Sequence, residues 1–170
     1  MAEMIDALNN LVRTHNQFKD DSELWRDIQA VTECSDKQAK KWAGEHCNMV
    51  SFWMMINARK ILEIDYPTYF QACLDEGFCR EDGYINKTKD IILAHWGIEY
   101  KRAYFETWDN VKDPSDLSED KLYQFKIKGH YMSSYIQDGQ VMISDTSSRG
   151  IGVPALKVIK QKQFIWMLEV

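Results

Sequence analysis

The sequence has no long hydrophobic run. None of its windows approaches the ~18 consecutive apolar residues that are needed to cross a bilayer. The N-terminal stretch MAEMIDALNNLVRTHNQF has neither a basic segment nor a continuous apolar segment, so it does not resemble a secretory signal. These absences predict a cytoplasmic protein that has no membrane partner.

Dense clusters of positive charge are also absent. The chain carries 21 Lys and Arg residues against 26 Asp and Glu residues, which gives a net charge of −5. The acidic residues are spread along the chain, and no basic group is dense enough to neutralise a phosphate backbone. Nucleic acid is therefore not an expected partner.

Cysteines spaced for metal binding are missing as well. The four cysteines show no C-x-x-C pair and no zinc-ribbon spacing, and His46 beside Cys47 has no second pair of ligands. We therefore predict no metal and no other cofactor. In a reducing compartment most of these thiols would be buried and unpaired, although a disulfide between Cys73 and Cys79 remains open.

What the chain does have is the composition of an ordinary globular domain. Of its 170 residues, 45% are hydrophobic and 28% are charged, which is usual for such domains. A chain of this size forms one domain and buries about two-thirds of its unfolded surface. We expect a single domain over residues 1–170 that needs no metal or disulfide for stability.

The first half of the sequence predicts helices. Apolar residues recur with a helical period over 4–12 and again over 24–31. Ser35 and Gln38 have the spacing of a capping box, and the short helix that begins there should stop at Gly44.

Three further helices are expected before the strands begin. The stretch CNMVSFWMMINA, which starts at Cys47, is apolar on nearly every face and predicts a central helix that is buried all round. Pro67 is placed to open another helix that Gly77 closes, and a third covers roughly residues 86–96.

The second half predicts strands. They are expected over Ile98–Phe105, over 123–127 and over Phe164–Leu168, and the stretch HYMSSYIQDGQVMISD predicts a hairpin. Its Asp138-Gly139 pair suits a type I′ turn, which needs positive φ at both central residues.

Helices followed by an antiparallel sheet are the α+β pattern. We expect residues 1–97 to form a mainly helical part and residues 98–170 a mainly antiparallel sheet part, both within one domain.

The hairpin register predicts a meeting of two polar side chains. If Asp138-Gly139 is a two-residue loop, Met132 faces Asp145, and His130 becomes a diagonal neighbour of Asp145 at roughly 7–8 Å between backbones. Asp145 would then accept the Nδ1 proton of His130 and fix its tautomer. This is the orienting half of a catalytic triad.

Cys47 is the candidate nucleophile. It opens the most apolar helix, where the positive end of the helix dipole favours a thiolate, and an imidazolium nearby would favour it further. Taken by themselves, a buried Cys, a polar His on a strand and an Asp at a turn are also common structural residues, so both interpretations stay open at this point.

A family resemblance supports the catalytic interpretation. A buried helix that opens with Cys, a later strand that opens with His-Tyr, and a hairpin whose return strand ends in ISD resemble the bacteriocin-processing, double-glycine-leader peptidases and the wider papain-like set. The stretches that carry the likeness are CNMVSFWMMINA, GHYMSSYIQDGQVMISDTSSRG and a final strand with Trp166, within residues 38 to 168.

The resemblance implies a papain-like cysteine protease fold and a catalytic role for three residues. Cys47 would be the nucleophile, His130 the general base and then the acid, and Asp145 the residue that orients His130. The implied reaction is attack of a thiolate on a carbonyl, formation of a thioester and hydrolysis. The implied partner is a peptide or protein substrate.

Two departures from the family pattern concern the nucleophile and the oxyanion hole. The family follows its Cys with Gly-Pro, where this chain has Asn48-Met49, and it places a Gln six residues before the Cys, where this chain has Lys41. One oxyanion donor should be the backbone N–H of Cys47, which is free at a helix start. For the other donor we favour Gln38, with Lys41 as the alternative.

Three functions compete at this stage. The leading one is a cysteine peptidase or amidase that hydrolyses a peptide-like bond. The second is an inactive papain-like relative that binds a peptide or protein in the same groove. The third is a thiol acyltransferase, which would use the same three residues and pass the acyl group to an amine.

Overall fold

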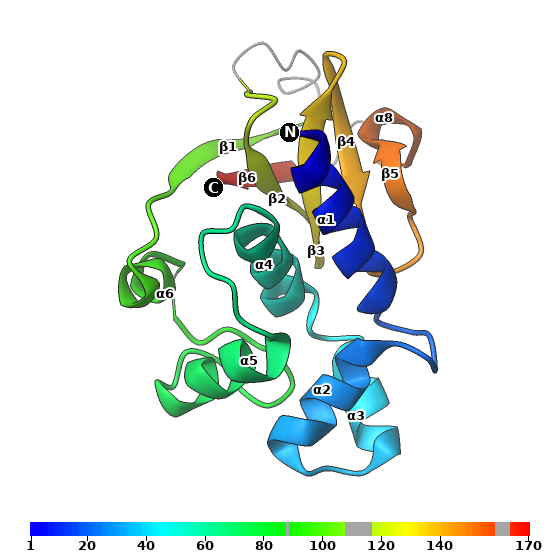
Figure 1. Cartoon of the computed structure of the whole chain (residues 1–170), viewed down its shortest axis with the longest axis vertical. Coiled ribbons are helices and arrows are strands. Elements are labelled where there is room, and N and C mark those ends of the chain that lie inside the picture. The colour runs from blue at the N-terminus through cyan, green and yellow to red at the C-terminus, as the bar shows by residue number, and fades with distance from the viewer. Residues whose placement is uncertain (88, 108–116, 159–163) are drawn as a thin grey trace.

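The computed structural model describes residues 1–87, 89–107, 117–158 and 164–170. Six of the seven helices in the described part of the chain come first, and the sheet follows with one short helix before its last strand (Figure 1), so the fold class is α+β, as predicted. The helices are α1 (Ala2–Thr14), α2 (Glu23–Thr32), α3 (Asp36–Ala43), α4 (Cys47–Ala58), α5 (Tyr66–Asp75), α6 (Lys89–Trp96) and α8 (Ala155–Val158); the strands are β1 (Lys101–Thr107), β2 (Leu122–Ile127), β3 (His130–Gln137), β4 (Gln140–Ser144), β5 (Ile151–Pro154) and β6 (Phe164–Glu169).

Local capping interactions start helices α3 and α5. Ser35 accepts a hydrogen bond from the backbone N–H of Gln38 at 3.2 Å and so caps α3, which ends before Gly44 as predicted. Asp65 accepts one from the N–H of Thr68 at 2.8 Å and caps α5. Each cap satisfies a backbone donor that has no partner inside its helix.

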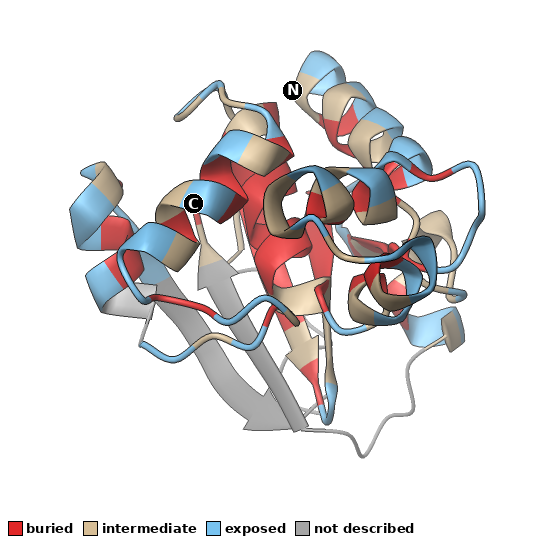
Figure 2. Ribbon diagram, turned by 90° about the horizontal axis from the view of Figure 1, so that it is seen from below, coloured by how far each residue is buried: buried red, intermediate tan, exposed pale blue. Residues whose placement is uncertain are grey.

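Helix α4 is the centre of the fold. Every residue from Met49 to Ile56 is buried (Figure 2), which confirms the prediction of a helix that is buried all round. One side of α4 packs on β2 and β3, another on α1, and a third on α5. A helix enclosed in this way has no polar face, and its sequence shows none.

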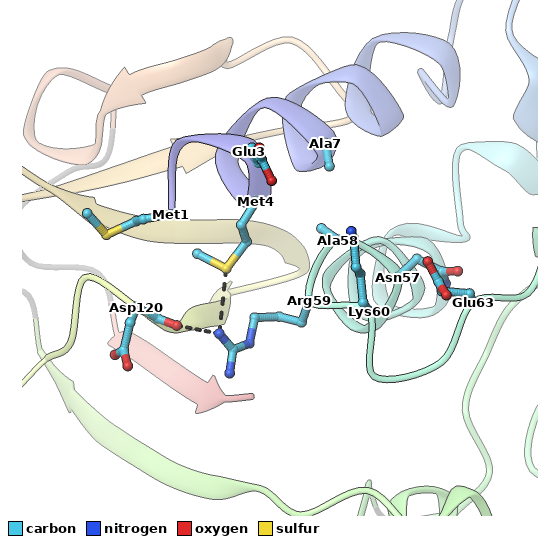
Figure 3. A pocket seen from close by; sticks show the side chains of 10 residues that line it. All are labelled: Met1, Glu3, Met4, Ala7, Asn57, Ala58, Arg59, Lys60, Glu63 and Asp120. Carbon is cyan, nitrogen blue, oxygen red and sulfur yellow. Dashed lines mark hydrogen bonds between the residues drawn. The ribbon is translucent and has the colours of Figure 1, made fainter.

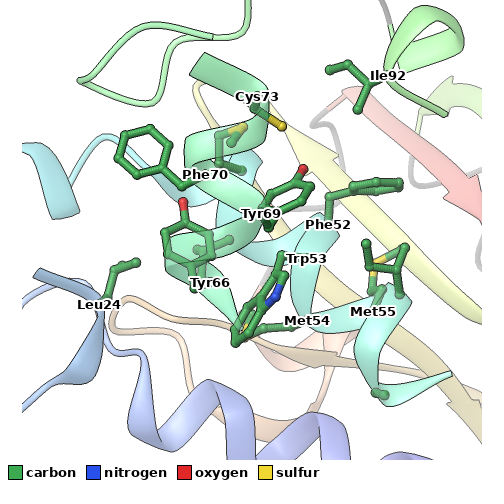
Figure 4. Packing of buried hydrophobic residues seen from close by; sticks show 14 of the residues in the cluster. Leu24, Phe52, Trp53, Met54, Met55, Tyr66, Tyr69, Phe70, Cys73 and Ile92 are labelled. Carbon is green, nitrogen blue, oxygen red and sulfur yellow. The ribbon is translucent and has the colours of Figure 1, made fainter. Parts of the chain in front are cut away.

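Aromatic side chains fill the space between α4 and α5 (Figure 4). Trp53 of α4 meets Tyr66 of α5 edge to face with ring centroids 5.2 Å apart, and Tyr66 stacks on Phe70 at 6.0 Å. These rings, together with Leu122 and Tyr135 of the sheet, belong to one core cluster. Helices α1 to α6 therefore share one core with one face of the sheet.

The six strands form one antiparallel sheet in the order β1-β6-β2-β3-β4-β5. Helices α1 and α4 cover one face of the sheet (Figure 1). A second cluster, which includes Phe125, Ile136 and Ile143, lies apart from the helical core, and Ala155 of α8 belongs to it. Successive side chains of β2 and β3 point to opposite faces of the sheet, so these two strands contribute residues to both clusters.

The β3–β4 hairpin has the predicted turn and the predicted register. Asp138 and Gly139 have φ values of 50° and 72°, as a type I′ turn requires. Ser134 pairs with Ile143, as expected from a two-residue loop. The register brings the start of β3 and the end of β4 to the same end of the sheet.

Some expected boundaries shift. Helix α6 is described only from Lys89, and residue 88 lies outside the described residues. The first strand begins at Lys101 rather than at Ile98, which is buried next to the end of α6. In the part of the chain that the structure describes, no helix is long and apolar enough to cross a membrane.

Candidate active site

His130 and Asp145 meet across the hairpin. His130 is the first residue of β3, Asp145 directly follows β4, and His130 Nε2 lies 2.7 Å from Asp145 Oδ1. The contact that the register predicted is therefore present, but the expected ring nitrogen was wrong. Nε2 is farther from the backbone than Nδ1, and the diagonal gap between the two strands needs this longer reach.

The carboxylate of Asp145 is fully buried and has several donors. Ser147 donates its backbone N–H to Oδ1 at 3.0 Å and its hydroxyl to Oδ2 at 2.7 Å. Arg149 Nη1 lies 3.5 Å from Oδ2, and the backbone N–H of Asp145 donates to Gly150 O at 2.9 Å. The loop after β4 thus folds back around the carboxylate. Sequence reasoning missed Ser147 and Arg149, although an Asp at the end of a strand is a known turn signal, because its side chain can accept from the backbone N–H two residues on.

Burial and pairing have opposite effects on the pKa values of His130 and Asp145. Burial by itself raises the pKa of Asp145, but the hydrogen bond and charge of His130, together with the donors of Ser147, hold that pKa below its ordinary value. Burial likewise disfavours protonated His130, yet its contacts with Asp145 and Cys47 and their charges raise its pKa to about 9. At neutral pH the pair is an imidazolium and a carboxylate.

Cys47 is the first residue of α4 and its side chain is partly exposed. Its backbone N–H donates to none of the residues that the structure describes, as expected for the first position of a helix. A hydrogen bond and the charge of its side chain are among the causes of the raised pKa of His130, so Cys47 and His130 are neighbours. The structure therefore brings together Cys47, His130 and Asp145, the three residues of the predicted triad.

A buried polar network fastens the start of α4 to the sheet. Gln124 of β2 donates through Nε2 to Asn48 O at 3.0 Å and Oδ1 at 3.1 Å, and to the Ser51 hydroxyl at 2.9 Å. Ser133 of β3 donates its hydroxyl to Ser51 O at 3.2 Å. These bonds set the position of Cys47 relative to β3, which begins with His130. The sequence signal for Gln124 was a polar residue inside an apolar strand.

His46, next to the nucleophile, has a structural role. It is buried, Nε2 lies 3.0 Å from Glu81 O and Nδ1 lies 2.6 Å from the hydroxyl of Tyr66. A carbonyl only accepts, so Nε2 carries the proton and Nδ1 accepts from Tyr66. Burial lowers the pKa of His46 to about 4. The described residues contain no group of three or more His, Cys, Asp or Glu side chains that would hold a metal ion.

The structure places both oxyanion candidates from the sequence on α3. Gln38 lies in the first turn of α3, about 7.5 Å of helix rise before Ala43, and so at the end of α3 that is farther from Cys47. Lys41 lies two positions before Ala43 and two after Ala39, which places it opposite the buried stripe that these alanines form, and its side chain is exposed. Neither hydrogen-bonds Cys47, His130 or Asp145 in the described part of the chain.

None of the four cysteines, all within the described part of the chain, forms a disulfide. Cys73 and Cys79 are both buried, and the disulfide left open by the sequence is not formed between them; Cys34 is partly exposed like Cys47. Burial raises the pKa of Cys79 to about 12. Cys34 is therefore the natural comparison for Cys47, because the two have similar exposure.

A cavity of about 570 Å³ lies away from the triad (Figure 3). It is formed by the start of α1 and the end of α4, and its lining includes Met4, Arg59 and Asp120. Helix α4 spans about 18 Å from Cys47 to Ala58. The cavity therefore lies at the opposite end of the central helix from the nucleophile.

Comparisons of the chain with protein-family models, with curated proteins and with solved structures found no match. What can be inferred about its chemistry therefore depends on the residues and on their geometry.

Proposed function

We propose that the protein is a papain-like cysteine hydrolase that cleaves a peptide-like bond with Cys47, His130 and Asp145. The observation that carries the proposal is the His130–Asp145 hydrogen bond of 2.7 Å beside a cysteine at the start of a buried helix. The raised pKa of His130, about 9, keeps the ring protonated at neutral pH. A protonated ring is the partner that stabilises a thiolate.

In this proposal the two ring nitrogens of His130 and the sulfur and backbone N–H of Cys47 each have a separate role. Nε2 of His130 is engaged by Asp145, which leaves Nδ1 for the thiol. The Cys47 thiolate attacks the carbonyl carbon, and the backbone N–H of Cys47 stabilises the oxyanion that forms. The C–N bond then breaks, the leaving amine takes the proton from His130, and the acyl group stays on sulfur as a thioester.

Hydrolysis of the thioester restores the enzyme. His130, now neutral, removes a proton from water while the oxygen attacks the thioester carbonyl. The C–S bond breaks, the acid product leaves, and Cys47 is again a thiolate beside protonated His130. Asp145 holds the ring in place through both steps and keeps its charge.

Alkylation of the thiols tests this proposal directly. Iodoacetamide at mildly acidic pH should modify Cys47 well before Cys34, whose exposure is similar, with the sites followed by mass spectrometry. His130→Ala should slow the Cys47 reaction by roughly 10-fold or more, because the thiolate loses its counter-charge. Equal reactivity of Cys47 and Cys34, or no effect of His130→Ala, would reject the proposal.

Two competing functions predict different products. A peptide library should yield cleavage products with the wild-type protein and none with Cys47→Ala. A thiol acyltransferase would instead pass the acyl group to an added amine in preference to water. A binding module would show reactive Cys47 without turnover, or no enhanced reactivity at all; the altered residues Asn48-Met49 after the nucleophile are the reason to include this outcome.

A further inference from the structure

Gln17 connects two segments that are far apart in sequence, and both border the triad. It lies beyond the end of α1 and is only 3% exposed. Its backbone N–H donates to Thr146 O at 2.8 Å, and its Oε1 accepts from the Thr146 hydroxyl at 2.9 Å. Thr146 directly follows Asp145, so one end of Gln17 is fixed to the loop that carries the acid.

The other end of Gln17 holds the turn before the nucleophile. Its Nε2 donates to Ala43 O at 3.0 Å and to Gly44 O at 3.1 Å. These carbonyls end α3, where the helix itself offers them no partner. The two bonds use both N–H groups of the amide, so Gln17 has no donor left for an oxyanion.

The turn that Gln17 holds leads directly into α4. His46 donates its backbone N–H to Ala43 O at 3.3 Å, and Cys47 follows as the first residue of the helix. A shift of Ala43 and Gly44 would therefore move the start of α4. Since Thr146 is tied to the same side chain, such a shift would also change the distance between Cys47 and the His130–Asp145 pair.

We propose that Gln17 is a positioning residue that aligns Cys47 with His130 by joining the turn at 43–46 to the loop after β4. This inference depends on the proposed function, because alignment matters only if the two side chains act together. Small misplacements of reacting groups are costly, and an error of about 1 Å can reduce a rate by roughly 100-fold. A buried side-chain amide that makes three hydrogen bonds, on a residue whose backbone N–H makes a fourth, is suited to prevent them.

Gln17→Met tests the inference, because methionine keeps the length of the side chain and removes its polar atoms. The matched control is Gln29→Met. Gln29 is also a bridging amide, since its Nε2 donates to Cys34 O at 3.0 Å and to Asp36 Oδ1 at 2.6 Å, but neither partner borders the triad. The measurement is the rate of Cys47 alkylation by iodoacetamide as a function of pH, in samples that near-UV circular dichroism shows to be folded.

Gln17→Met should slow Cys47 alkylation by roughly 10-fold or more and move the acid limb of its pH profile upward, because the thiolate is held less well against the imidazolium. Gln29→Met should leave the alkylation rate within about twofold and the acid limb where it is in the wild type. Gln17→Glu adds a readout that volume alone would not change. Its carboxylate repels the two carbonyls, so its defect should exceed that of Gln17→Met at neutral pH and shrink when acid protonates it.

The outcomes separate this inference from the proposed function. If His130→Ala slows alkylation and Gln17→Met only lowers the melting temperature, Gln17 is a structural bridge and the inference is wrong. If His130→Ala has no effect, the proposed function fails, and with it any alignment role. If Gln17→Met does not fold, Thr146→Val removes only the hydroxyl contact with Gln17 Oε1. It should then slow alkylation by about threefold or more, and a normal rate would overturn the inference.

Discussion

Asp145 accepts its hydrogen bond from Nε2 of His130, the ring nitrogen farther from the backbone, at 2.7 Å. The nearer nitrogen, Nδ1, is therefore the one that remains for the thiol of Cys47. The carboxylate sits in a fully buried position, so its charge acts on the ring with little screening from water. The pKa of His130 therefore reports directly on its pairing with Asp145.

Asp145→Asn should lower the pKa of His130 from about 9 toward its ordinary value of 6.5, because the ring loses the charge of its partner. Titration of the His130 ring protons by NMR would show the shift. Asp138→Asn is the matched control, since it removes the same charge from the exposed turn of the same hairpin. An unchanged pKa in Asp145→Asn would contradict the prediction.

The same pKa predicts how stability depends on pH. Between pH values of about 6.5 and about 9 the folded protein keeps a proton on His130 that the unfolded chain has released. Stability should therefore fall as the pH rises through this window. Urea unfolding should show this fall for the wild type, and Asp145→Asn should flatten it.

His46 should have the opposite effect at lower pH. Its pKa falls from 6.5 to about 4 on folding, chiefly through burial, so the unfolded chain binds a proton that the folded protein excludes. Stability should fall as the pH drops from about 6.5 to about 4. His46→Gln keeps a donor for Glu81 O and an acceptor for Tyr66 without titrating, and it should weaken this dependence. His95→Gln, on an exposed position, should leave it unchanged.

Gly83 leaves no room for a side chain beside His46. A Cβ at this residue would lie 2.6 Å from His46 Cδ2, whereas one at Gly77 would meet nothing within 4 Å. Both glycines have positive φ, 85° and 71°, so alanine at either costs about 1–2 kcal/mol of backbone strain. Gly83→Ala should lose a further ~1–3 kcal/mol through overpacking. Equal unfolding free energies for the two variants would show that the contact with His46 is not tight.

The oxyanion hole is tested by comparing Gln38→Ala with Lys41→Met. Gln38 lies in the first turn of α3, and the side chain of Lys41 is exposed. We therefore expect each variant to keep its turnover within about threefold, whereas loss of a true oxyanion donor costs roughly 100-fold to 1,000-fold. Steady-state rates on a cleaved peptide provide the measurement. If Gln38→Ala lost about tenfold or more in turnover while Cys47 was alkylated normally, Gln38 would be an oxyanion donor after all.

Local rules account for the features that could be predicted from the sequence. The all-apolar stretch after Cys47 required a buried helix, because such a helix has no face for solvent. The Ser35 cap and the Asp138-Gly139 turn depend on neighbouring residues alone. The turn then set the register that places His130 near Asp145. The α+β order and the His130–Asp145 contact follow from these short-range patterns.

Tertiary structure decided what surrounds the three residues. Which ring nitrogen meets Asp145 depends on the gap between strands, and the burial of His46 depends on Tyr66 and Glu81, 20 and 35 residues away. Gln124 reaches a partner 76 residues away, and the sequence marks it only as a polar residue inside an apolar strand. Gln17 reaches a partner 129 residues away, and no pattern marks it, because an amide that is buried among distant partners looks the same in sequence as one in water. The sequence by itself determined most of the helices and strands, although not β5 or α8, and it determined the turn and the His130–Asp145 contact. Cys47 joined that pair only through the family resemblance. Only the fold determined the hydrogen-bond partners that hold them in register, because those partners come from segments that meet only after the helices pack on the sheet.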